Sequence, residues 1–159
     1  MSFRNLEAPG PPQLEIASLR VWVHGREFPN AHDYWDGNWL RVTACCSNPN
    51  SKVQTQGPII HLAEISRLGF SLKQLYKSLK GQAALECIEP NLNVSLVAGN
   101  TGHIEVRISI TPDQLTEEHL FIETIDQSYL PPMIAACENI LKLYPIREAE
   151  LLPKLEEDD

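Results

Sequence analysis

The sequence has no long apolar run. No stretch approaches the roughly 18 consecutive apolar residues that a membrane helix needs, and residues 1–12 lack the apolar segment of a secretory signal. These two absences argue against a membrane-spanning helix and against secretion. They favour a soluble protein that stays in the cytoplasm.

Motifs for catalysis and for cofactor or metal binding are also missing. The chain has no Gly-x-Ser-x-Gly elbow, no glycine-rich phosphate loop and no His-Glu-x-x-His pair. Its 4 cysteines form no Cys-x-x-Cys pair, and none has a histidine at metal-ligand spacing. Because all of them lie in apolar segments, buried reduced thiols are favoured over disulfides or a metal. The sequence therefore predicts a protein that is not an enzyme and that has no cofactor.

Positive charge is scarce. The 13 lysines and arginines are outnumbered by 21 aspartates and glutamates, which gives a net charge of −8, and half of that charge falls on residues 146–159. An acidic body argues against binding to nucleic acid, which needs a basic face. It fits attraction to a basic protein partner. It also fits plain solubility, the commoner reason for a modest negative charge.

Proline, charge and periodicity divide the chain into three parts. Residues 1–13 contain Pro9-Gly10-Pro11-Pro12, which cannot form a helix or a central strand, and predict a mobile leader. Residues 14–147 predict a single α+β domain. The acidic residues 148–159 predict a mobile tail.

Within the domain, runs of strands alternate with two helices. Strands are predicted over 14–28, 39–46, 53–62, 83–89, 92–98, 103–111 and 119–125. Gly57-Pro58 is expected to interrupt the third of them. One helix is expected to begin at a Ser71 cap and to end near Gly81, and the last helix is expected to begin at a Ser128 cap. Residues 63–68 are a candidate for an earlier turn of the first helix, although Gly69 weakens the link. This order predicts a largely antiparallel sheet of about six or seven strands with two helices packed on one face.

The most informative stretch is Asp33-Tyr34-Trp35-Asp36-Gly37-Asn38-Trp39-Leu40. Its Asp-Gly-Asn core predicts a turn, because glycine accepts a positive φ without steric cost. The flanking tryptophans either pack under this turn or anchor a partner. His32, Asp33 and Asp36 together could bind a metal or move a proton, but local turn roles for both carboxylates are the simpler interpretation.

The octapeptide resembles the motif of the WapI-like immunity proteins, which are cytoplasmic bacterial antidotes to the toxic C-terminal domains of wall-associated and related polymorphic toxins. Two further blocks are similar to the family's pattern. They are Gly102-His103-Ile104-Glu105-Val106 and Ile125-Asp126-Gln127-Ser128-Tyr129-Leu130-Pro131. The likeness spans roughly residues 14–147.

The resemblance implies a non-catalytic inhibitor that binds and masks a cognate toxin C-terminal domain. If that toxin is a nuclease, its cleft is basic, and carboxylates in place of phosphates are the expected complement. The candidate partner-binding residues are Trp35, Asp36, Glu105, Glu117, Glu118, Glu123 and Asp126.

Three other functions are open on the sequence alone. A small-ligand or carbohydrate-binding module could stack a sugar on Trp35 and Trp39. An enzyme could use His32 with Asp33 and Asp36. A subunit of a larger cytoplasmic assembly would need no site of its own.

Overall fold

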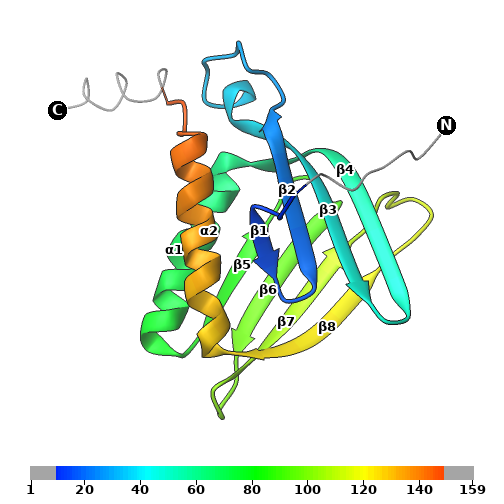
Figure 1. Cartoon of the computed structure of the whole chain (residues 1–159), viewed down its shortest axis with the longest axis vertical. Helices are drawn as coiled ribbons and strands as arrows, with labels where there is room; N and C mark the ends of the chain where they lie inside the picture. The colour runs from blue at the N-terminus through cyan, green and yellow to red at the C-terminus, as the bar shows by residue number, and fades with distance from the viewer. Residues whose placement is uncertain (1–9, 149–159) are drawn as a thin grey trace.

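The computed structural model describes residues 10–148. Two antiparallel sheets of four strands each pack with two α-helices (Figure 1). The first nine residues of the predicted leader and the predicted tail beyond Glu148 lie outside the described residues. No helix within the described range is long and apolar enough to cross a membrane.

The first sheet has the strand order β1-β2-β3-β4. Its strands are β1 (Leu14–Ile16), β2 (Leu19–Arg26), β3 (Trp39–Asn48) and β4 (Ser51–His61). The sequence predicted one strand over 14–28, and this was wrong, because a tight turn at Ala17 and Ser18 makes a hairpin of it. Ala17 adopts a φ of 53°, which alanine rarely does. The turn therefore carries no glycine, asparagine or aspartate by which the sequence could have marked it.

Pro58 lies inside β4, where an interruption was predicted. The strand continues through it, with a shift in its pairing to β3 between Leu40 and Arg41. Gly57 takes a φ of 150° at this irregularity, a value that suits glycine. An edge strand tolerates a proline because one of its sides has no ladder, and β4 ends the first sheet.

The second sheet has the order β5-β6-β7-β8. Its strands are β5 (Gln82–Glu86), β6 (Leu92–Ala98), β7 (His103–Ile110) and β8 (Leu120–Asp126). The predicted alternation is confirmed on the central strands, where Val94, Val106 and Ile108 are buried while Glu105 and Arg107 are exposed. This sheet therefore has one face in the core and one in solvent.

The prediction of one sheet of six or seven strands was wrong, although the α+β class and the antiparallel pairing are confirmed. The chain leaves β4 into helix α1 (Leu62–Ser78), so β4 and β5 do not pair. Each sheet instead buries its apolar face in one shared core. Helix α2 (Leu130–Leu143) contacts β1 while α1 contacts β5, so the helices line one side of the two sheets (Figure 1).

Helix α1 begins well before the predicted Ser71 cap. His61 is its N-cap: the ring Nδ1 accepts the N–H of Ala63 at 3.2 Å, and Glu64 Oε1 accepts the N–H of His61 at 2.7 Å. This is a capping box built on histidine, which is not among the residues preferred at that position. The cap prediction failed for that reason.

A glycine inside α1 also obscured the helix in the sequence, because glycine weakens helices. At Gly69 a Cβ would lie 3.2 Å from the Cβ of Cys137 on α2, so glycine lets the two helices approach closely. The predicted Ser128 cap on the last helix is wrong as well. Asp126 caps the preceding 3-10 turn η2 (Gln127–Tyr129), because its carboxylate accepts the N–H of Ser128 at 2.8 Å.

Candidate functional site

The octapeptide forms the second half of the loop between β2 and β3 and the first two residues of β3, at one end of the first sheet (Figure 1). Asp33 Oδ2 accepts the N–H of Asp36 at 2.8 Å, at the start of the 3-10 turn η1 (Asp36–Asn38). A Cβ on Gly37 would lie 2.6 Å from the carbonyl oxygen of Ala31, so the loop needs glycine there. A turn is present where one was predicted, but the predicted reason was wrong, because Gly37 has no positive φ and is required instead by the close approach of Ala31. One of the two carboxylates of the turn serves the local backbone.

Asn38 is fully buried and ties this loop to the chain that follows α2. Its Nδ2 donates to the carbonyl oxygens of Tyr34 at 2.6 Å and Arg147 at 2.9 Å, and its Oδ1 accepts the N–H of Arg147 at 2.8 Å. Arg26 donates to the carbonyl of Gly37 at 2.6 Å. Burial, and then the neighbouring Arg147, lower the pKa of Arg26. The side chain of Asn38 and the carbonyl of Gly37 therefore hold the loop against two other segments of the chain, whereas Asp36 is exposed.

The two tryptophans of the motif differ in exposure, at 51% for Trp35 and 9% for Trp39. Their rings meet edge to face, with centroids 5.8 Å apart and planes at 87°. The ring of His61 lies against both of them and donates from Nε2 to the carbonyl of Trp35 at 3.1 Å. A sugar needs an exposed aromatic face to stack on, and only Trp35 offers one here.

His32, Asp33 and Asp36 do not form a metal site in the structure. No group of three or more histidine, cysteine, aspartate or glutamate side chains within residues 10–148 could hold a metal ion. The carboxylate of Asp33 is already engaged by the backbone of the turn.

The predicted carboxylates cluster around β7 and β8, but they lie on two different faces of the second sheet. Glu105 and Asp126 are on the outer, solvated face. Glu123 is paired with the buried Val106 and points inward. Its Oε2 accepts the N–H of Ser18 at 3.0 Å and also the Ser18 hydroxyl. Glu123 therefore links β8 to the β1–β2 turn and does not share a surface with the outer pair.

The two outer carboxylates have close neighbours of their own. Glu105 Oε1 lies 2.7 Å from Nε of Arg107, which offsets its charge. Asp126 accepts hydrogen bonds from the hydroxyl and the N–H of Ser128, and these lower its pKa. Asp126 therefore stays ionised at any physiological pH, whereas Glu105 adds little net negative charge.

Glu117 and Glu118 are exposed in the loop that leads into β8. The Oε2 of Glu117 lies 3.3 Å from Nε2 of His119. Glu117 and Glu118 precede β8, and Glu123 lies within it. The end of the second sheet at which β8 begins is therefore its most acidic end.

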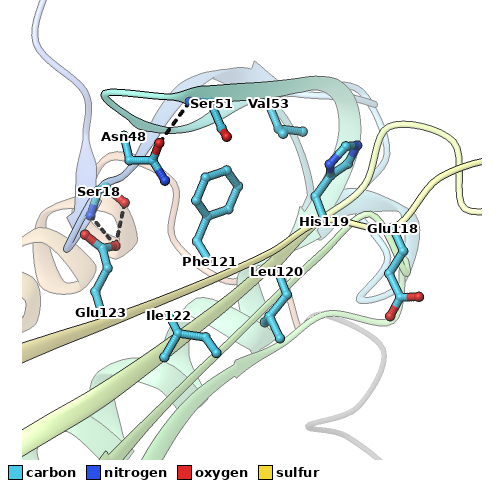
Figure 2. A pocket seen from close by; sticks show the side chains of 10 residues that line it. All are labelled: Ser18, Asn48, Ser51, Val53, Glu118, His119, Leu120, Phe121, Ile122 and Glu123. Carbon is cyan, nitrogen blue, oxygen red and sulfur yellow. Dashed lines mark hydrogen bonds between the residues drawn. The ribbon is translucent and has the colours of Figure 1, made fainter.

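Beside this acidic end lies a cleft of about 440 Å³ between β8 and the turns of the first sheet (Figure 2). Its walls are Ser18, Asn48, Ser51, Val53, Glu118, His119, Leu120, Phe121, Ile122 and Glu123. Phe121 and Glu123 point toward the first sheet, whereas Leu120 and Ile122 point the other way (Figure 2). Among residues 10–148, glutamates are the only fully charged side chains that line this cleft, and no lysine or arginine of that range contributes to it.

The loop with Trp35 and Asp36 and the acidic cleft do not form one site. The loop joins the far ends of β2 and β3, while the cleft is lined by the turns at their other ends (Figure 1). A strand of the length of β3, Trp39–Asn48, spans about 30 Å. The seven predicted partner-binding residues therefore fall in three places: the loop with Trp35 and Asp36, the acidic cleft with its neighbouring glutamates, and the outer face of the second sheet with Glu105 and Asp126.

Sequence reasoning missed the neutral residues of the cleft, above all Ser18, Leu120 and Ile122. Ser18 was hidden because the β1–β2 turn has no turn signature. The two apolar residues could have been found, because in β8 they alternate with Phe121 and Glu123. An apolar side chain on the wet face of a sheet is the signal that was available.

A family model provides the decisive comparison. The family model described as "Immunity protein WapI-like family" matches residues 13–145 of this chain. The chain belongs to the WapI-like immunity protein family. The match covers both sheets and both helices, so the family extends over the whole of the described fold, including the acidic cleft. Comparisons with curated proteins and with solved structures gave no significant match.

Proposed function

We propose that this member of the WapI-like family is an immunity protein that binds a cognate toxin domain and masks it in the cytoplasm, without chemistry of its own. The observation that carries the proposal is the family match over residues 13–145. Masking needs only a complementary surface, and it therefore fits a chain in which the sequence shows no catalytic motif.

The acidic end of the second sheet is the surface we assign to the toxin. Glu117 and Glu118 are exposed there, and the adjoining cleft gives a partner a concave place to enter. A toxin that cleaves or binds nucleic acid has a basic cleft, and exposed carboxylates attract such a surface and speed its association. At the other end of the molecule, the octapeptide offers mainly the single indole of Trp35.

The function is tested with the toxin domain encoded by the neighbouring reading frame. Co-expression with this protein is expected to restore growth, and the two purified chains are expected to form a stoichiometric complex that blocks the toxin's activity. Growth arrest despite full expression, together with no complex at micromolar concentrations, would contradict the proposal.

The acidic surface is tested by reversing Glu117 and Glu118 to lysine. The association rate with the toxin domain is expected to fall about tenfold at low salt, because surface charges act mainly on the encounter. The control reverses Glu15 and Glu86, which are exposed on the opposite edges of the two sheets and change the net charge by the same amount. Equal rates for the two double variants would remove Glu117 and Glu118 from the interface.

A further inference from the structure

Three of the four outer strands of the two sheets are protected against pairing with another chain. An unprotected edge is a template for a further strand, and proteins shorten it, cover it or interrupt it. Strand β1 has only three residues and contacts α2, β5 is packed against α1, and β4 contains Pro58 with a shifted pairing. Strand β8 has seven residues without a proline, lysine or bulge.

The main-chain groups at the open side of β8 can be assigned from its pairing with β7. Ile110 donates to the carbonyl of His119, so these two residues form a hydrogen-bonded pair. In an antiparallel ladder such pairs alternate. Leu120, Ile122 and Thr124 therefore direct their N–H and C=O groups away from β7, toward the side where the sheet ends.

The side chains around this edge indicate the chemistry of an added strand. Leu120 and Ile122 are 51% and 55% exposed on the outer face, where they can pack against apolar residues of a neighbour. Within the part of the chain that the structure describes, the adjacent cleft carries the carboxylates of Glu118 and Glu123 and no lysine or arginine. An extended segment with alternating basic and apolar residues fits both features.

We propose that the edge of β8 from Leu120 to Thr124 receives an extended basic segment of the partner protein as a fifth strand of the second sheet. The identification of that partner as a toxin domain rests on the proposed function. Glu123 is held by Ser18, and its inward-pointing carboxylate opposes pairing of this edge strand with a second copy of itself. A basic segment brings a counter-charge to the exposed carboxylate of Glu118 at the start of the edge.

The edge is tested without the toxin by a nine-residue peptide of alternating lysine and valine, added to the ¹⁵N-labelled full-length protein. The peptide is expected to shift the amide resonances of Leu120, Ile122 and Thr124. A peptide with glutamate in place of lysine is the charge control and is expected to leave them unchanged. Shifts confined to other strands, or no shift at millimolar peptide, would overturn the proposal.

Two substitutions of Ile122 distinguish the contribution of its backbone N–H to peptide binding from the contribution of its side chain. Ile122→Pro removes an outward N–H and leaves the ladder to β7 intact, because proline is tolerated on the open side of an edge strand. It is expected to weaken peptide binding at least about tenfold. Ile122→Thr keeps the N–H while losing apolar surface, and it is expected to change affinity by less than about threefold. Equal affinities for the two variants, with circular dichroism confirming the fold, would refute strand addition.

The same variants are then measured against the toxin domain from the neighbouring reading frame. If the wild type protects cells and Ile122→Pro protects equally well, the proposed function stands and the strand addition is refuted. If the wild type gives no protection, the proposed function fails, and strand addition at β8 is then tested by the peptide measurement alone. A concentration-dependent dimer that Ile122→Pro abolishes would assign the edge to a second copy and overturn the proposal.

Discussion

Replacing Asn38 by alanine tests whether the octapeptide stabilises the fold by connecting the loop before β3 to the chain after α2. The side chain is fully buried and makes hydrogen bonds with the backbone of Tyr34 and with both main-chain groups of Arg147. Asn38→Ala leaves these groups without partners, and a buried polar group that loses its partner costs about 1–3 kcal/mol. Because Tyr34 and Arg147 are only partly buried and water can replace part of these hydrogen bonds, we expect a loss of about 3 kcal/mol in the free energy of unfolding.

This loss is measured by urea unfolding followed by tryptophan fluorescence, since Trp35 and Trp39 flank the substitution. The corresponding fall in melting temperature is about 6–12 °C for a chain of this length. Asn30→Ala is the control, because Asn30 is exposed in the same loop, and its effect is expected to stay within about 0.5 kcal/mol. If both variants unfold at the same urea concentration as the wild type, the hydrogen bonds of Asn38 do not stabilise the fold.

Three further predictions concern the core. Gly69→Val is expected to cost about 1–3 kcal/mol of stability, because its Cβ meets that of Cys137, and adding Cys137→Gly should return part of the loss in a thermal melt. Glu64→Ala is expected to cost about 2–4 kcal/mol in urea, because two backbone N–H groups donate to this buried carboxylate, whereas Glu64→Gln should cost less. Burial raises the pKa of Cys46, of Cys87 and of Cys137, the last to about 12. These thiols are therefore neutral at about pH 8, and mass spectrometry should find no iodoacetamide adduct on them until the protein unfolds.

The strands of the second sheet were predictable because each alternates between a dry and a wet face. Leu92, Val94 and Leu96 repeat at every second position, and Pro90-Asn91 and Gly99-Asn100-Thr101-Gly102 mark the turns before and after this strand. The division into two sheets was not predictable in the same way. It depends on which strands pair across the helix that separates β4 from β5, and pairing between distant segments leaves no local trace in the sequence.

The missed details have local causes. The β1–β2 turn contains Ala17 in a left-handed conformation without any residue that favours it. The first helix begins with His61 as its cap, and Gly69 within it is explained only by the neighbouring helix. At His61 and Gly69, contacts with distant parts of the chain override the local preference.

The candidate site was predictable in composition but not in geometry. The acidic stretch 105–126 does lie at one region of the molecule, yet Glu123 and Asp126 are an odd number of positions apart on one strand and face opposite ways. This alternation was readable from the sequence. The distance between the Trp35 loop and the acidic cleft was not, because it depends on how the hairpins of the first sheet are arranged.

Side chains that already make contacts within the chain are poor candidates for binding a partner. The exposed groups without such contacts indicate where a partner can bind. In the octapeptide, Asn38 and the turn around Asp33 use their polar groups on contacts within the chain. A residue whose hydrogen bonds are satisfied internally has little to offer a partner unless the fold opens. At the other end, Glu118, Leu120 and Ile122 are exposed next to a cleft, and the backbone of β8 has a side that faces no strand within the described chain. The octapeptide therefore uses its buried polar groups mainly to maintain the fold, and the edge of β8 remains the surface that we propose for the partner.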